Sequence, residues 1–207
     1  MILKGEDIAT LLESWGPQTT DPLVITPEPN TKQLRDSGSA SVDLRLGTWL
    51  LKLQQTKRSA LKLSEEADTS EESRLTKLYY VPFGDKFILH PRTFVLGVTL
   101  EWVRLPKNLA AYVIGRSSWG RRGLIVVTAS GVHPGFTGCL TLELSNVGEM
   151  PIEISPGLSI CQLFLHEARP TKLDFVDRTA FVGLRRPTLG HIEFDEVAKK
   201  LFKAQST

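Results

Sequence analysis

The sequence has few cysteines and no long apolar segment, and these absences exclude several classes of protein. Cys139 and Cys161 are the two cysteines among 207 residues, and neither lies in a Cys-x-x-Cys or Cys/His ligand spacing. A disulfide framework or zinc site is therefore disfavoured, and the pattern predicts buried free thiols in a reducing cytosol. Because the chain has no run of about 18 apolar residues and no secretory signal pattern, we expect a soluble, cytoplasmic protein without a membrane partner.

An excess of charge of one sign is also missing. The chain has 25 basic and 23 acidic residues, which gives a formal net charge of +2. General nucleic-acid surfaces are strongly basic, so no nucleic-acid partner is expected and any anion binding must be local. With 41% hydrophobic residues in 207, the chain can bury one sizeable core, and we expect a single domain over residues 1–207.

Motifs for several hydrolytic chemistries are absent as well. The chain contains no G-x-x-x-x-G-K-[ST] phosphate loop and no G-x-S-x-G nucleophile elbow. Zinc-dependent base deamination requires His-x-Glu together with Pro-Cys-x-x-Cys, and His191-Ile192-Glu193 supplies only the first half. These three chemistries are set aside, and no metal site made of protein ligands is expected.

Short apolar runs separated by Gly, Pro and Asn fill most of the chain. Many of them alternate with a period of two, which is typical of strands. Such a series predicts a mainly β fold, either a barrel or a sandwich. The expected strands are 24–25, 41–53 with a break at Gly47, 78–81, 87–89, 94–103, 110–114, 124–128, 138–146, 150–154 and 159–166.

Helices are expected only near the two ends. Glu6 and Asp7 precede apolar residues spaced as one face of a short helix, and residues 17–38 are interpreted as proline-rich connecting structure. Residues 55–78 are polar and are interpreted as a solvated insertion. Residues 170–207 form an expected C-terminal tail or lid that ends in an amphipathic helix over 195–202.

The nine-residue stretch Gly115–Gly123 has the composition of an anion-binding turn. It holds three arginines, two serines and three glycines between two apolar runs. Glycines allow close backbone approach, serines supply short donors, and arginine forks match phosphate oxygens. A basic, glycine-containing surface loop is the alternative at this point.

Two carboxylates lie on the polar faces of expected strands. Glu143 faces away from Leu140, Leu142 and Leu144, so it points either to solvent or into a cavity where desolvation suits a general base. Asp43 shares a face with Arg45, and we interpret them as a cross-strand or intersubunit ion-pair element.

Five blocks, in order along the chain, resemble the dCTP deaminase branch of the dUTPase-like superfamily. They are S-V-D-L-R-L-G at 41–47, G-R-S-S-W-G-R from Gly115, T-A-S-G-V-H-P-G-F-T-G from Thr128, L-T-L-E-L-S-N-V-G from Leu140 and P-G-L-S-I-C-Q-L at 156–163. The resemblance implies a dUTPase-like distorted β-barrel or jelly roll with a short N-terminal helix and a C-terminal tail. It also implies a homotrimer whose sites are completed by neighbouring subunits.

By the same resemblance, the activity is metal-free hydrolytic deamination of dCTP to dUTP and ammonia. Glu143 is the implied general base and acid, Ser117 orients the attacking water, and Ala129 meets the water and the cytosine amino group through its carbonyl. Arg121 completes the implied catalytic set. The implied nucleotide-binding residues are Arg116, Ser117, Ser118, Trp119, Gly120, Arg121, His133, Thr141, Leu142, Glu143 and Gln162. Mg²⁺ enters with the triphosphate.

Three departures from the family pattern keep other functions open. His133 stands where the family usually has Asp, and the stretch before it is one residue shorter. The usual residues that close over the triphosphate are missing from the tail, where Arg185 and Arg186 are the available substitutes. The alternatives are a dUTP pyrophosphatase, a bifunctional deaminase and pyrophosphatase, and a non-catalytic nucleotide sensor.

Overall fold

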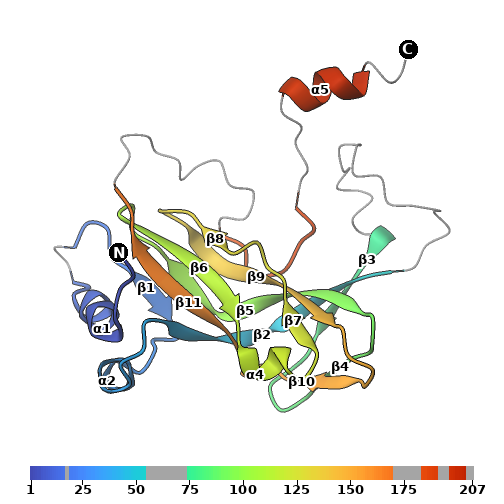
Figure 1. Ribbon diagram of the computed structural model, residues 1–207, viewed down its shortest axis with the longest axis horizontal. Coiled ribbons are helices and arrows are strands. Elements are labelled where there is room, and N and C mark those ends of the chain that lie inside the picture. Colours follow the sequence, from blue (N-terminus) through green and yellow to red (C-terminus); the bar gives the residue numbers. More distant parts are fainter. Residues whose placement is uncertain (17–18, 55–73, 170–182, 191–195, 204–207) are drawn as a thin grey trace.

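A curled antiparallel sheet forms the body of the protein, and Figure 1 shows it in the computed structural model. The structure describes residues 1–16, 19–54, 74–169, 183–190 and 196–203. The strands follow the order β7-β9-β5-β2-β11-β6-β8, with β1 added to β5 and β3 added to β2. They are β1 (Val24–Thr26), β2 (Val42–Leu53), β3 (Thr76–Tyr80), β5 (Phe94–Arg104), β6 (Leu109–Gly115), β7 (Leu124–Val126), β8 (Gly131–Val132), β9 (Thr137–Asn146) and β11 (Ser159–Glu167).

The remaining elements are short. A second sheet pairs β4 (Phe87–Leu89) with β10 (Ile152–Ile154). The helices are α1 (Gly5–Glu13), α2 (Thr31–Asp36), α4 (Ser117–Gly120) and α5 (Glu196–Lys203). No helix in the described parts of the chain is long and apolar enough to cross a membrane.

Strand β2 joins the two halves of the sheet. Its first part, from Val42 to Arg45, pairs with β11, and its second part pairs with β5 and β3. The pairing with β5 changes register between Leu46 and Leu50, and Gly47 lies at this point. A Cβ on Gly47 would approach the backbone oxygens of β5 to 3.1 Å. The expected break at Gly47 is therefore a bend within one continuous strand, where two strands meet too closely for a side chain.

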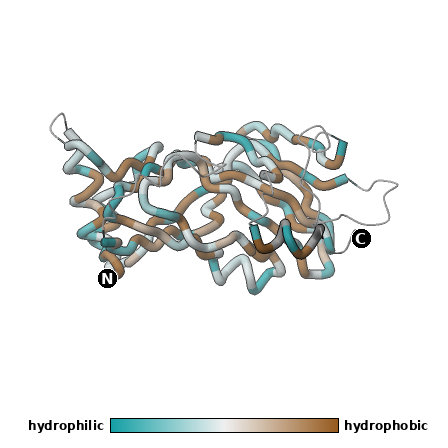
Figure 2. The backbone as a smooth tube through the Cα atoms, turned by 90° about the horizontal axis from the view of Figure 1, so that it is seen from above, coloured by the Kyte–Doolittle hydropathy of each residue, from teal (hydrophilic) through white to brown (hydrophobic). Residues whose placement is uncertain are grey.

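The core is built from alternate residues of the strands. In β9, buried and half-buried residues alternate along the whole strand. Leu142 and Leu144 are completely buried in the same apolar cluster as Ile8 of α1. Figure 2 shows that hydrophobic and hydrophilic residues are interspersed along the backbone. Since each large buried side chain contributes about 1.5 to 3 kcal/mol, a shift of β9 by one residue would be very unfavourable.

Most of the expected elements are confirmed, and the differences have local causes. Helix α2 lies within 17–38, where only connecting structure was expected; Asn30 caps it by accepting a hydrogen bond from the Gln33 N–H at 3.0 Å. Strand β3 begins at Thr76, inside the stretch 55–78 that was read as a loop. That interpretation was wrong for its last residues, because β3 is an edge strand in which Thr76 alone is buried, so burial gives it no alternating pattern. Residues 55–73 lie outside the described part.

The two cysteines are free thiols, as expected. Cys161 is completely buried, and burial raises its thiol pKa to about 12. Cys139 is only half-buried, and burial also raises its pKa. Neither thiol is therefore appreciably ionised near neutral pH.

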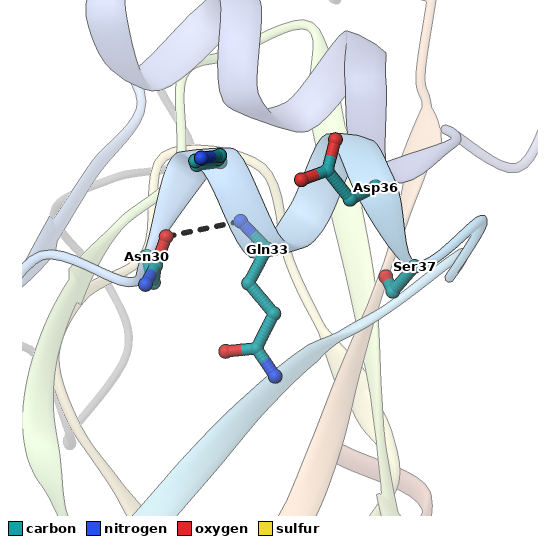
Figure 3. Close-up of a pocket in the computed structure, with 5 residues that line it drawn as sticks. Asn30, Gln33, Asp36 and Ser37 are labelled. Atoms are coloured by element: carbon teal, nitrogen blue, oxygen red, sulfur yellow. Dashed lines mark hydrogen bonds between the residues drawn. The ribbon is translucent and has the colours of Figure 1, made fainter.

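A surface pocket of about 440 Å³ lies along α2 (Figure 3). Residues of α2 and its two ends line it: Asn30, Lys32, Gln33, Asp36 and Ser37. None of these residues belongs to the five sequence blocks.

Asn146, at the end of β9, is a buried polar residue that connects three separate backbone groups. Its side-chain N–H groups donate to the carbonyls of Leu89 at 2.9 Å and Met150 at 2.8 Å, and its oxygen accepts from the Gly148 N–H at 2.9 Å. Removing the amide would leave all three groups without this partner, and the carbonyl of Leu89 belongs to a completely buried residue.

We therefore predict that Asn146→Ala lowers the free energy of unfolding by about 2 to 4 kcal/mol, measured by urea denaturation. The neighbouring Ser145→Ala is the matched control, because the Ser145 hydroxyl makes no hydrogen bond in the described structure. Equal stability of both variants would contradict a structural role for the amide.

Candidate active site

The loop between β6 and β7 is shaped by two glycines that permit close packing. Gly115 ends β6, and a Cβ there would lie 3.1 Å from the Cβ of Val126 in β7. Gly123 has a φ of 87°, and a Cβ on it would lie 2.9 Å from the backbone nitrogen of Gly148. Between them, residues 117–120 form the short helix α4, which was not expected from the sequence. A left-handed conformation and a tight approach both favour glycine at position 123.

The side chains of Trp119 and Arg116 connect α4 to β11 and β2. The indole N–H of Trp119 donates to the carbonyl of Ser159 at 2.7 Å. Nη1 of Arg116 donates to the Ser159 hydroxyl at 2.7 Å and forms an ion pair with the Asp43 carboxylate. These contacts fix the position of the loop relative to the β2–β11 pair.

Other groups of the loop have no partner within the described residues. The hydroxyl of Ser117 and the guanidinium of Arg121 are exposed and make no side-chain contact there. The backbone N–H groups of Ser117 and Ser118 are likewise unbonded in these parts of the chain. Arg122 instead turns back and donates to the Ser118 carbonyl at 2.8 Å. Unpaired backbone N–H groups and an unpaired guanidinium on one loop are donors that can bind an anion.

The position of Glu143 is fixed by its backbone, while its carboxylate stays free. Its N–H donates to the Thr128 hydroxyl at 2.9 Å, and its carbonyl accepts from the Val127 N–H at 2.8 Å. The side chain is half-buried and has no partner among the described residues. Ala129, the next residue after Thr128, is exposed and lies beside this part of β9.

The neighbours of Glu143 in β9 differ in what they can offer a ligand. Thr141 is half-buried on the same face as Glu143. Leu142 is completely buried, so its side chain belongs to the core and only its backbone can reach a ligand on the face of Glu143.

His133 and Gln162 lie in different surroundings. His133 is exposed at a turn before β9, where its carbonyl accepts from the Phe136 N–H at 3.2 Å. Gln162, in β11, donates from Nε2 to the Ser41 hydroxyl at 3.1 Å and to the Asp43 carboxylate at 3.2 Å. Gln162 thus belongs to the same hydrogen-bonded network as Arg116.

Most of the predicted site residues fall into two groups, and His133 belongs to neither. We call residues 116–121 with Asp43, Ser159 and Gln162 the α4 group, and Thr128, Ala129, Thr141, Leu142 and Glu143 the β9 group. Within the described residues, no hydrogen bond or ion pair joins the Glu143 carboxylate to any side chain of the α4 group.

The described part of the tail runs beside the beginning of β9. The Gly183 N–H donates to the carbonyl of Thr137 at 2.8 Å, and the Leu184 carbonyl accepts from the N–H of Cys139 at 3.0 Å. Arg185 lies over the ring of Trp102 at 4.9 Å, and Arg186 lies over Trp49 at 4.3 Å. The two tail arginines thus stack on indoles in this structure.

The α4 group contains two residues that the sequence did not suggest as site residues. Asp43 was interpreted as part of a cross-strand or intersubunit ion-pair element, and Ser159 was not considered. Arg45 does form a cross-strand pair, with Glu101 of β5 at 2.7 Å, but Asp43 contacts Arg116 and Gln162. Both residues lie within the recognised blocks, but a local sequence pattern cannot show which blocks are in contact.

In the described parts of the chain, no three His, Cys, Asp or Glu residues are grouped so as to hold a metal ion.

Comparison with known proteins gives concordant matches in sequence and fold. A family model described as dCTP deaminase-like matches residues 2–168. A protein of Dictyoglomus thermophilum named "dCTP deaminase, dUMP-forming" is 37% identical over 205 residues, covering 97% of this chain and 99% of that protein. A dCTP deaminase of Natronomonas pharaonis is 44% identical over 131 residues, which cover 63% of this chain and 66% of that protein.

Among solved structures, the 2'-deoxycytidine 5'-triphosphate deaminase of Agrobacterium tumefaciens matches with a TM-score of 0.58 at 20% identity. The match covers 81% of this chain and 46% of that chain. The mainly β fold expected from the sequence is confirmed.

Proposed function

The chain belongs to the dCTP deaminase-like family, and from this premise we propose that it hydrolyses dCTP, with water replacing the 4-amino group of cytosine to give dUTP and ammonia. The observation that carries the proposal is the family match over residues 2–168, which spans both the α4 group and the β9 group. The unpaired, half-buried carboxylate of Glu143 supports it.

Glu143 is the proposed general base and acid. Bulk water has a pKa of about 15.7, so it needs a positioned base to attack a ring carbon without a metal-bound hydroxide. The carboxylate accepts a proton from water as the oxygen bonds to C4, and it returns a proton to the amino nitrogen as ammonia leaves. Because the Glu143 backbone is held at both its N–H and its carbonyl, the carboxylate projects from a fixed point.

The remaining proposed roles follow the family pattern. Ser117 orients the water, and the Ala129 carbonyl accepts from the water and the cytosine amino group. Thr141 and Leu142 flank the base, and His133 lies under the sugar. Arg116, Arg121, Gln162 and residues 118–120 bind the phosphates and sugar. Mg²⁺ arrives bound to the triphosphate and neutralises part of its charge, which fits an α4 group rich in N–H donors rather than in carboxylates.

We also propose a homotrimer in which each site combines the α4 group of one subunit with the β9 group of another. The absence of a hydrogen bond or ion pair between the two groups within the described part of one chain supports this arrangement, because Ser117 and Glu143 must meet at one water. We also propose a cytoplasmic location, because deoxynucleotides are made there.

A second candidate function differs in what happens to the triphosphate after deamination. Several relatives, including that of D. thermophilum, are named dUMP-forming, so pyrophosphate release after deamination is the alternative. His133 argues for dUTP as the product, because a neutral imidazole accepts a hydrogen bond from a sugar hydroxyl but supplies no carboxylate to activate a second water. A nucleotide sensor without activity is the third possibility.

The first test follows ammonia and pyrophosphate separately after dCTP or dUTP is added to the purified protein. We expect ammonia from dCTP, and we expect Glu143→Gln to lower kcat by about a hundredfold or more while dCTP still binds. Glu149→Gln is the control, since Glu149 is exposed and unpaired in the described structure. Undiminished turnover in Glu143→Gln would remove this residue from the mechanism, and a wild-type protein that binds dCTP without turnover would be a sensor.

The second test asks whether the α4 and β9 groups of one site come from different subunits. Arg121→Ala and Glu143→Gln chains, each inactive alone, are coexpressed with different tags and purified as mixed oligomers. Shared sites predict recovery of about one quarter of wild-type activity at equal mixing, since some sites then receive both intact groups. If each site were built from one chain, the mixture would stay inactive.

The third test concerns the product. We expect wild-type protein to release ammonia with little pyrophosphate, and His133→Asp to keep its deaminase activity while the ratio of pyrophosphate to ammonia rises. His133→Asn is the matched control, because it has a similar shape without the charge. Equal amounts of ammonia and pyrophosphate from the wild type would show that dUMP forms without a carboxylate at position 133.

A further inference from the structure

The carboxylate of Asp43 connects two residues of the α4 group that come from different elements. One oxygen pairs with Nη1 of Arg116, and the other accepts from Nε2 of Gln162 at 3.2 Å. The same Nη1 donates to the Ser159 hydroxyl at 2.7 Å, and the same Nε2 donates to the Ser41 hydroxyl at 3.1 Å. Asp43 is thus the shared acceptor of one network that links β2, β11 and the residue before α4.

This network leaves one side of the Arg116 guanidinium free. A guanidinium has five N–H groups, and the two on Nη1 are directed to Asp43 and Ser159. Nε and Nη2 have no partner among the described residues, and together they form the edge that binds two phosphate oxygens at once. The side chain of Arg116 is 32% exposed, so this edge can be reached from solvent.

Arg116 differs in this respect from Arg121 on the same loop. Arg121 is exposed and has no anchor in the described structure, so binding an anion must first order its side chain. Arg116 is already held at Nη1 and by the packing of α4 against β11. Preorganisation of this kind lowers the entropic cost of binding.

We propose that Asp43 is a positioning residue for the deaminase reaction: it holds Arg116, and with it Gln162, in the orientation that receives the phosphates of the nucleotide. This inference rests on the proposed function and assigns to Asp43 a role beyond a surface ion pair. Because Asp43 acts through Arg116, its loss should weaken nucleotide binding and leave the chemical step unchanged.

Asp43→Asn tests the proposal while preserving the size of the side chain. We expect the KM for dCTP to rise about tenfold, because the amide has one acceptor oxygen for two donors and no charge, while kcat stays within about twofold. Calorimetric titration should show weaker binding of dCTP and unchanged binding of deoxycytidine, which has no phosphate. Glu153→Gln is the matched control, since it also removes an exposed carboxylate that pairs with a cation, Lys86 at 2.7 Å.

A double-mutant cycle shows whether Asp43 acts through Arg116. In an Arg116→Ala background, Asp43→Asn should change dCTP affinity by less than about twofold, since the group it positions is gone. An equal loss in both backgrounds would overturn the proposal and leave Asp43 with a general structural role. Tighter dCTP binding by Asp43→Asn would also overturn it, because the carboxylate would then compete with phosphate for Arg116.

These outcomes are separable from those that test the proposed function. If the wild-type protein releases no ammonia from dCTP, the deaminase proposal fails whatever Asp43 does. If the wild type is active and Asp43→Asn matches it in KM and kcat, only the inference about Asp43 fails. Unchanged thermal unfolding and oligomer size of Asp43→Asn are the controls for its fold.

Discussion

The alternation of buried leucines along β9 is the constraint on which the candidate site depends. A period of two allows only one set of residues to face the core, and Leu140, Leu142 and Leu144 take those positions. Glu143 must then lie on the opposite face, where it stays only half-buried and unpaired in the described structure. Packing of the leucines in the core thus determines the face on which the Glu143 carboxylate lies, although this carboxylate is not part of the core.

A second set of contacts fixes α4, a helix too short to hold its own position. Four helical residues are marginal in water, so their conformation depends on contacts with neighbouring strands. Trp119 and Arg116 provide these contacts through Ser159 of β11 and Asp43 of β2. Because β2 and β11 are central strands of the sheet, these contacts attach the loop to the core. The side chains of Ser117 and Arg121 nevertheless stay exposed.

The sequence predicted what depends on local pattern and missed what depends on distant contacts. The strands and α1 follow from apolar periodicity, and the Gly47 bend follows from an absent side chain. Asp43 and Arg116 are 73 residues apart in the chain, and Arg116 and Ser159 are 43 apart, so no local pattern reports that they meet. The same reason explains why α4 was read as a plain turn: its few helical residues carry little periodicity, and their stability comes from across the fold.

The described tail shows how a weak local pattern can be fixed by tertiary contacts. Residues 183–190 have little periodicity, yet two backbone hydrogen bonds align Gly183 and Leu184 with the start of β9. Arginines stack well on indoles because a guanidinium is planar, charged and only weakly hydrated. Arg185 and Arg186 use this geometry on Trp102 and Trp49, which lie on neighbouring strands β5 and β2. A stacked guanidinium keeps the N–H groups at its edge, because stacking uses only its face. Backbone and side-chain contacts together therefore hold the described tail against the sheet, although its sequence has no strand or helix period.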